Sequence, residues 1–130
     1  MKDNKTWNIE PKISIVLTQE DIDDIMVGSL EGGSNYWCER VEVLEEYYGE
    51  YASEQISRGG SLRFFDIETD DFWDLTLEKF LNGVKLWLES GAAFRWNAVT
   101  VENKLDCGCI DAIQADSIVQ YALFGEIVFA

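Results

Sequence analysis

Hydrophobic residues recur along the chain with the periods of both helices and strands. Apolar residues at helical spacing predict three helices, near 19–31, 76–90 and 111–124. Thr18, Thr76 and Asp111 stand where the N-terminal caps belong, and the first of them opens a capping box with Asp21. Each helical pattern ends at glycine, the residue that most easily adopts the left-handed conformation after a helix.

Short β-branched and aromatic runs predict the strands. A strand is expected at each of 13–17, 41–43, 55–57, 61–67 and 72–75. Gly59 and Gly60 lie between two of these runs and predict a tight hairpin, because paired glycines supply the positive φ that such turns need. Helices dispersed among antiparallel strands predict an α+β fold with a mainly antiparallel sheet. We expect residues 1–12 to form a tail and residues 13–130 a single compact domain.

Charge narrows the range of partners. The 130 residues include 10 Lys and Arg against 25 Asp and Glu, giving a formal net charge of −15. Such a field repels nucleic acids and anionic lipid surfaces, so direct binding to nucleic acid or membrane is not expected. The same field attracts basic proteins. A purely solubilising role for the acidic residues stays open.

The chain carries no sign of export. Residues 1–10 hold no apolar leader, and no run of about 18 apolar residues could span a bilayer. Its three cysteines are an odd number, which favours reduced thiols over a disulfide framework. We therefore expect the protein to be cytoplasmic. If it comes from a phage, this compartment is the cytosol of the host cell.

The composition argues against catalysis and against a metal cofactor. Histidine is absent, which removes the commonest general base and zinc ligand. Cys107 and Cys109 form a CxC pair and not the usual CxxC knuckle, so no metal is expected. The acidic run that begins at Asp66 resembles a calcium loop, but Asp71 and Leu77 stand where that loop needs glycine and glutamate. The prediction is a protein without enzymatic activity and without cofactors.

Two segments, 32–38 and 49–60, combine glycine, amide, hydroxyl and aromatic groups on expected loops. Close backbone approach, aromatic faces and an arginine suit a planar or anionic ligand. The candidate ligand-binding residues are Asn35, Tyr36, Trp37, Gln55, Ser57 and Arg58. The competing interpretation is that the aromatic residues fill the core and that the glycines only make turns.

Two acidic clusters with interspersed aromatic residues predict a protein-binding surface instead. Carboxylates along a face can take the place of phosphates against arginine and lysine, and aromatic residues can anchor the contact. The candidate partner-binding residues are Glu42, Glu45, Glu46, Tyr47, Tyr48, Glu50, Tyr51, Asp70, Asp71, Phe72, Trp73 and Asp74. The alternative is a solvated face with no partner.

Several motifs together resemble small uncharacterised acidic proteins encoded by phages and mobile elements of Gram-positive bacteria. They are LTQEDIDDIM at 17–26, LEGG at 30–33, NYWC at 35–38, GEYASEQISRGG at 49–60, LTLEKFLNG at 75–83 and QYALFGE at 120–126. Residues 92–109 fit less well. The resemblance implies a phage setting and brings no established activity or catalytic residue.

These observations lead to two functional hypotheses. The first is a non-enzymatic, anti-CRISPR-like inhibitor that binds a host defence protein, such as a nuclease with a basic groove, through its acidic surface. The alternative is a small-molecule binding protein that sequesters a nucleotide signal of host defence. Homo-oligomerisation stays open in both.

Overall fold

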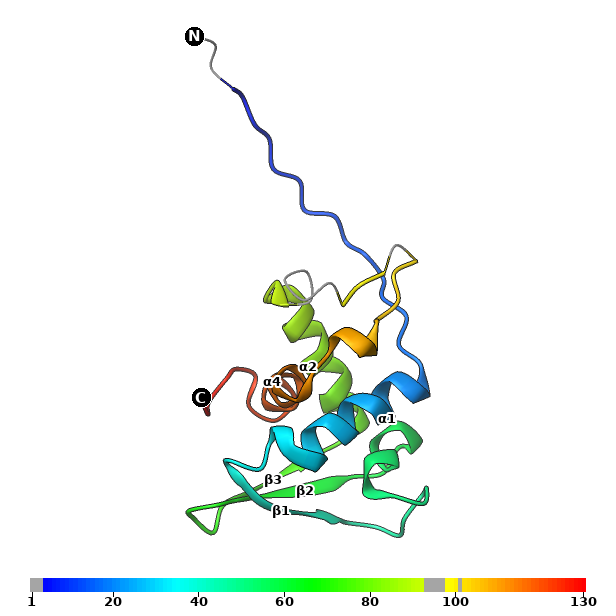
Figure 1. The fold of residues 1–130 in the computed structure, drawn as a ribbon, viewed down its shortest axis with the longest axis vertical. Helices are drawn as coiled ribbons and strands as arrows, with labels where there is room; N and C mark the ends of the chain where they lie inside the picture. Colours follow the sequence, from blue (N-terminus) through cyan, green and yellow to red (C-terminus); the bar gives the residue numbers. More distant parts are fainter. Residues whose placement is uncertain (1–3, 93–97, 101) are drawn as a thin grey trace.

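The chain forms a layer of helices packed on one face of a small sheet (Figure 1). This computed structural model describes residues 4–92, 98–100 and 102–130. Within them the α-helices are α1 (Gln19–Gly28), α2 (Leu77–Glu89) and α4 (Ala112–Phe124), and the strands are β1 (Cys38–Val43), β2 (Leu62–Asp66) and β3 (Phe72–Leu75). The short helical turns are η1 (Ser29–Gly33), which is π-helical, and the 3-10 turns η2 (Ala52–Glu54), η3 (Ile56–Arg58) and η4 (Cys107–Cys109). The expected α+β class with an antiparallel sheet is confirmed.

The predicted helix starts are confirmed at all three α-helices. The Thr18 hydroxyl accepts from the Asp21 backbone N–H at 3.1 Å, and the Asp21 carboxylate accepts from the Thr18 N–H at 2.9 Å, which completes the capping box. Thr76 and Asp111 likewise accept backbone N–H groups in the first turns of α2 and α4. At the other end of α4, Gly125 adopts a φ of 76°, the left-handed cap that glycine favours.

The sheet has the order β1-β2-β3, with both neighbouring pairs antiparallel. Because side chains alternate along a strand, each face carries a different set. The face toward the helices is apolar and carries Val41, Val43, Leu62, Phe64, Trp73 and Leu75. The opposite face, here named the open face, carries Arg40, Glu42, Arg63, Phe65, Phe72 and Asp74.

Aromatic residues join the sheet to the helices. Trp37 is only 2% exposed, and its ring lies between Phe64 of β2 and Phe129 of the C-terminal tail, with centroid distances of 5.9 and 5.0 Å. Trp73 meets Phe124 of α4 edge to face at 4.9 Å. The C-terminal segment is thus a tail that packs on this aromatic cluster.

The expected hairpin at Gly59-Gly60 and the strand at 55–57 are wrong. Residues 52–58 form the turns η2 and η3, and Gly59 ends η3 with a φ of 88°. Gly60 has a different role, since a side chain there would overlap the buried amide of Gln55. β2 instead pairs with β1 and β3. Gly59 is needed to end a helical turn, and Gly60 is needed for close packing on Gln55. A glycine pair with these roles cannot be told from a hairpin turn by sequence alone.

The strand expected at 13–17 does not join the sheet. Val16 makes a single parallel bridge with Lys104, and its N–H donates to the Asn103 carbonyl at 2.9 Å. Residues 4–17, here named the N-terminal arm, run extended away from the body before α1 begins (Figure 1). Residues 1–3 of the expected tail lie outside the described residues. Across the described ranges, no helix is both long and apolar enough to cross a membrane.

α2 and α4 cross at a glycine, and this contact gives a direct test of the packing. A Cβ at Gly83 would lie 2.6 Å from the Ala122 Cβ and 2.7 Å from its Cα. We expect Gly83→Ala to lower the free energy of unfolding by about 2 kcal/mol, because overpacking outweighs the gain in helix propensity of about 1 kcal/mol. Chemical denaturation measures the change.

Asn82→Ala is the matched control, because Asn82 is exposed on the same helix. It should change the free energy of unfolding by less than about 0.5 kcal/mol. A Gly83→Ala protein as stable as this control would contradict the close crossing of α2 and α4.

Candidate functional site

The segment between β1 and η2, residues 44–51, is here named the acidic loop. It contains three glutamates, at positions 45, 46 and 50, and three tyrosines. All six side chains are exposed, and the exposed fractions of Tyr47, Tyr48 and Tyr51 are 60%, 45% and 61%. Large aromatic side chains are usually covered in a monomer, so three of them beside carboxylates on one loop mark a surface suited to a partner.

Buried and half-buried polar side chains hold this loop in place. Gln55 is fully buried; its Oε1 accepts from the Tyr48 N–H at 2.9 Å, and its Nε2 donates to the Glu46 carbonyl at 3.1 Å. The Glu54 carboxylate accepts from the N–H groups of Glu50 and Tyr51 at 2.8 and 3.0 Å. These backbone donors, Tyr51 first, lower the pKa of Glu54. The loop backbone is therefore fixed by its own fold.

One of the loop glutamates also has a structural contact. The Glu45 Oε1 accepts from the Ser61 N–H at 3.1 Å, which ties the loop to the start of β2. Gly49 is needed beside Glu54, because a Cβ at this position would lie 2.7 Å from the Glu54 Cβ. Glu46 and Glu50 are exposed, which leaves their carboxylates facing solvent.

The open face of the sheet is charge-balanced. Arg63 donates two hydrogen bonds to the Asp74 carboxylate, at 2.8 and 3.0 Å, and hydrogen bonding to Arg63 is the main cause that lowers the pKa of Asp74. Arg40 lies 3.8 Å from the centre of the Phe65 ring and pairs with Glu42 at 3.2 Å. Two of the predicted partner-binding acids thus already have cationic partners here.

The second acidic cluster lies at the other end of the sheet. The acidic turn, residues 67–71, joins β2 to β3, whereas the acidic loop follows the far end of β1. Since a five-residue strand spans roughly 13–17 Å, the two clusters are separate surfaces with the neutral open face between them. Asp70 and Asp71 are exposed on the turn, and Phe72 is 48% exposed beside it. Trp73 points the other way, into the aromatic cluster with Trp37.

The six candidate ligand-binding residues are not gathered in one place. Trp37, Gln55 and Ser57 have internal partners: the Trp37 indole donates to Asp116, Gln55 holds the acidic loop, and the Ser57 hydroxyl donates to Asp23 at 2.6 Å. Arg58 also faces Asp23 at 3.5 Å. A small cavity of about 270 Å³ lies beside the turn before β1, and of the six only Asn35 lines it.

A buried carboxylate that accepts four side-chain hydrogen bonds was missed by sequence reasoning. Asp116 of α4 is 3% exposed, and both its oxygens accept hydrogen bonds from four side chains. These donors are Ser34 at 2.7 Å, Tyr36 at 2.7 Å, Trp37 at 2.8 Å and Gln120 at 2.9 Å. The signal was a polar pair at i and i+4 inside an apolar helix pattern, which points one acidic and one amide group into the core.

Gln120 extends this network to the C-terminal tail. Its Oε1 accepts from the backbone N–H groups of Val128 and Phe129 at 2.9 and 2.8 Å, and its Nε2 donates to the Phe129 carbonyl at 3.1 Å. The Gln120 amide thereby satisfies backbone groups of the tail that a neighbouring strand would otherwise satisfy. The Asp116 network therefore fixes the turn before β1, α4 and the tail together.

The CxC pair has the properties of protonated thiols. Burial, and then the nearby Asp21 carboxylate, raise the pKa of Cys107 to about 12. The hydrogen bond to Asp106 raises the pKa of Cys109. In the part of the chain that the structure describes, no group of three acidic or cysteine side chains is placed to hold a metal ion.

Exposed carboxylates and phenols on a fixed backbone can accept hydrogen bonds from lysine and arginine and can cover apolar surface. No protein-family model, no curated protein and no solved structure matches this chain. A role for the acidic loop therefore follows only from its own chemistry.

Tyr36 provides a pH-dependent test of the Asp116 network. Burial, followed by the hydrogen bond to Asp116, raises its pKa from 10.0 to about 12. The fold thus favours the neutral phenol, so its contribution to stability is complete below pH 10 and is lost as the pH rises through about 12. We expect Tyr36→Phe to lower the free energy of unfolding by about 1–2 kcal/mol at neutral pH.

The difference between wild type and Tyr36→Phe should then shrink between pH 10 and pH 12 in denaturation experiments. Tyr47→Phe is the control and should follow the wild type throughout, because Tyr47 is exposed. A stability difference that stays constant to pH 12 would show that Tyr36 is not coupled to Asp116 as described.

Proposed function

We propose that the protein is a non-enzymatic binding protein that docks its acidic loop onto a basic surface of a nucleic-acid-handling protein. The supporting observation is that three exposed tyrosines and three exposed glutamates share one loop whose backbone is already fixed. A loop ordered before binding loses little conformational entropy when a partner arrives. Tyrosine adds a large contact area with few rotatable bonds.

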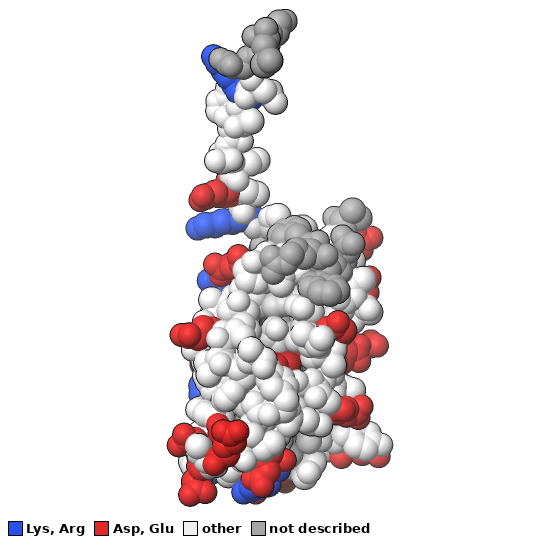
Figure 2. All heavy atoms as spheres, turned by 60° about the vertical axis from the view of Figure 1, so that its left-hand side comes forward, with Lys and Arg blue, Asp and Glu red and all other residues white. Residues whose placement is uncertain are grey.

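The charge of the molecule favours the same kind of partner. The formal net charge is −15, and acidic side chains lie along the margins and the lower end of the body in Figure 2. Such a field steers a basic partner toward the protein, and it keeps nucleic acid away. Charge mainly sets the rate and orientation of association, so the tyrosines would supply the short-range affinity.

The phage-type motifs extend the proposal to a biological setting. In that setting the partner is a host defence nuclease, and the protein is an anti-CRISPR-like inhibitor that covers a groove meant for nucleic acid. Glu46 and Glu50 would take the place of phosphates against arginine and lysine of the groove. The open face of the sheet contributes less, because its acids are paired with Arg40 and Arg63.

Affinity capture from host lysate, followed by mass spectrometry and by binding measurements with the captured protein, tests this proposal. We expect the double variant Glu46→Lys and Glu50→Lys to weaken binding at least about tenfold, and Tyr47→Ala with Tyr51→Ala to do the same. High salt should weaken capture, because exposed charges are screened beyond about 10 Å at 0.1 M. Neither pair of substitutions removes a hydrogen bond that holds the loop.

The acidic turn supplies a control of equal charge change. Glu68→Lys with Asp70→Lys alters the net charge by the same amount at the other end of the sheet. It should leave binding within about twofold of the wild type. If both reversals act equally, binding follows the overall charge and not the acidic loop. If neither acts and capture is insensitive to salt, the proposed function is wrong.

A further inference from the structure

The N-terminal arm has the sequence of a strand that is covered on one face. Between positions 7 and 15 of the arm, before the exposed Val16, the odd positions are apolar: Trp7, Ile9, Pro11, Ile13 and Ile15. Even positions 8, 10, 12 and 14 are polar, which gives the alternation of a half-buried strand. The body covers only the inner end, because Ile15 and Leu17 pack on the core while Ile9 and Trp7 are 85% and 81% exposed.

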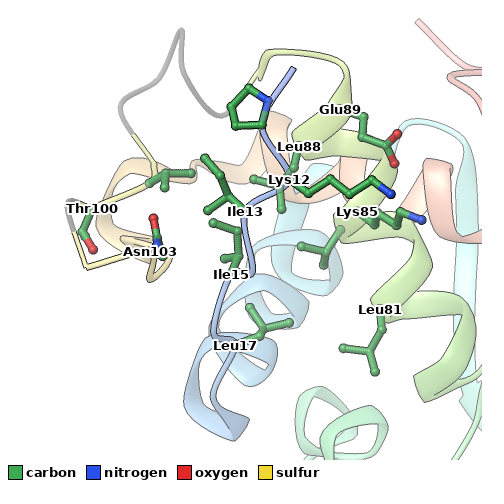
Figure 3. Close-up of a pocket in the computed structure, with 13 residues that line it drawn as sticks. Lys12, Ile13, Ile15, Leu17, Leu81, Lys85, Leu88, Glu89, Thr100 and Asn103 are labelled. Carbon is green, nitrogen blue, oxygen red and sulfur yellow. The ribbon is translucent and has the colours of Figure 1, made fainter. Parts of the chain in front are cut away.

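An apolar groove lies at the root of this arm (Figure 3). Ile13, Ile15 and Leu17 form one wall, and Leu81, Val84 and Leu88 of α2 form the other. Its volume is about 1010 Å³, which is as large as a pocket for a sizeable ligand. Lys12 and Lys85 carry amines near its rim, as Figure 3 shows, beside the carboxylate of Glu89.

The arm cannot fill the groove of its own chain in this conformation. Its inner half is already one wall, and its outer half leads away from the body (Figure 1). In the described part of the chain, residues 4–15 make no hydrogen bond, so the strand edge of the arm is unpaired. One molecule therefore presents both an exposed apolar strand and a matching apolar groove. Two-fold symmetric dimers satisfy this kind of self-complementarity.

Charge also favours a second copy at this end. Two bodies that each carry a large negative charge repel one another, but basic side chains stand out along the arm in Figure 2. Lys5, Lys12 and Lys85 lie here together with Glu10 and Glu89. A contact through the arms keeps the acidic bodies apart.

We propose that the N-terminal arm is a homodimer interface, in which the arms of two copies pair antiparallel and each inserts Trp7 and Ile9 into the groove of the other. The register that centres on Pro11 sets Ile9 opposite Ile13 and Glu10 opposite Lys12 of the second copy. Pro11 then stands at a pair that needs no backbone donor, which a proline can occupy. The dimer leaves both acidic loops free, because the sheet lies at the opposite end of the body (Figure 1).

Sedimentation equilibrium of the purified full chain over a range of concentrations tests this interface. The wild type should approach twice the chain mass of 14.9 kDa, and Trp7→Ala with Ile9→Ala should remain monomeric. Both residues are exposed, so the variant should keep the fold, which circular dichroism checks. A wild type that stays monomeric up to about millimolar concentration, where even weak dimers form, would overturn the proposal.

A charge swap tests the register and the identity of the partner. Glu10→Lys and Lys12→Glu should each weaken the dimer about tenfold, since each creates two like-charged pairs across the two-fold axis. Combining both changes in one chain should restore the wild-type dissociation constant to within about threefold. Failure of the double variant to recover would contradict the antiparallel pairing, as would a dimer insensitive to every arm variant.

Discussion

The buried carboxylate of Asp116 is the interaction on which the arrangement of the irregular segments depends. It lies on α4, yet three of its four donors come from the turn that leads into β1. Removing this acceptor would leave neutral donors without their partner, at a cost of about 1–3 kcal/mol for each one that is buried. Since β1 begins where this turn ends, the position of the sheet under the helices follows from one side chain.

Gln55 acts in the same way at the other end of β1. A loop of eight residues with three exposed tyrosines would ordinarily be mobile, because nothing apolar covers it. Here the buried amide accepts and donates at the loop backbone, and Glu54 accepts two more of its N–H groups. Glycine at positions 49 and 60 makes room for these two side chains. The fold thereby gives a fixed shape to a segment that has no regular structure.

Contacts between residues distant in sequence explain what sequence patterns could and could not predict. Helices follow from local signals, and the caps at Thr18, Thr76 and Asp111 lie where the pattern put them. Residues 55–57 carry a strand-like pattern, but the chain turns here, with the 3-10 turn η3 from Ile56, and both Gln55 and Ile56 are buried. Whether a strand-like segment pairs in a sheet depends on contacts across the whole chain, and no local pattern encodes these contacts.

For the site, sequence reasoning found the right residue types but not their grouping. Clusters of acids and aromatic residues indicated an acidic and aromatic surface, and the acidic loop contains six of the twelve predicted partner-binding residues, three glutamates and three tyrosines. Sequence reasoning could not show that Asp74 pairs with Arg63 or that Trp73 faces the core, since both depend on strand register. Asp116 and Gln120 were missed because their spacing of four residues places them on one helix face but does not show that this face is buried.

The central claim is that buried polar side chains fix the acidic loop before any partner binds. Amide hydrogen exchange of the free protein tests it most directly. The N–H groups of Tyr48, Glu50 and Tyr51 should exchange at least about tenfold more slowly than in an unstructured chain, because each is hydrogen-bonded to a side chain. The N–H of Tyr47, which has no partner among the described residues, should exchange fast. Exchange at the unstructured rate for all four would contradict the account.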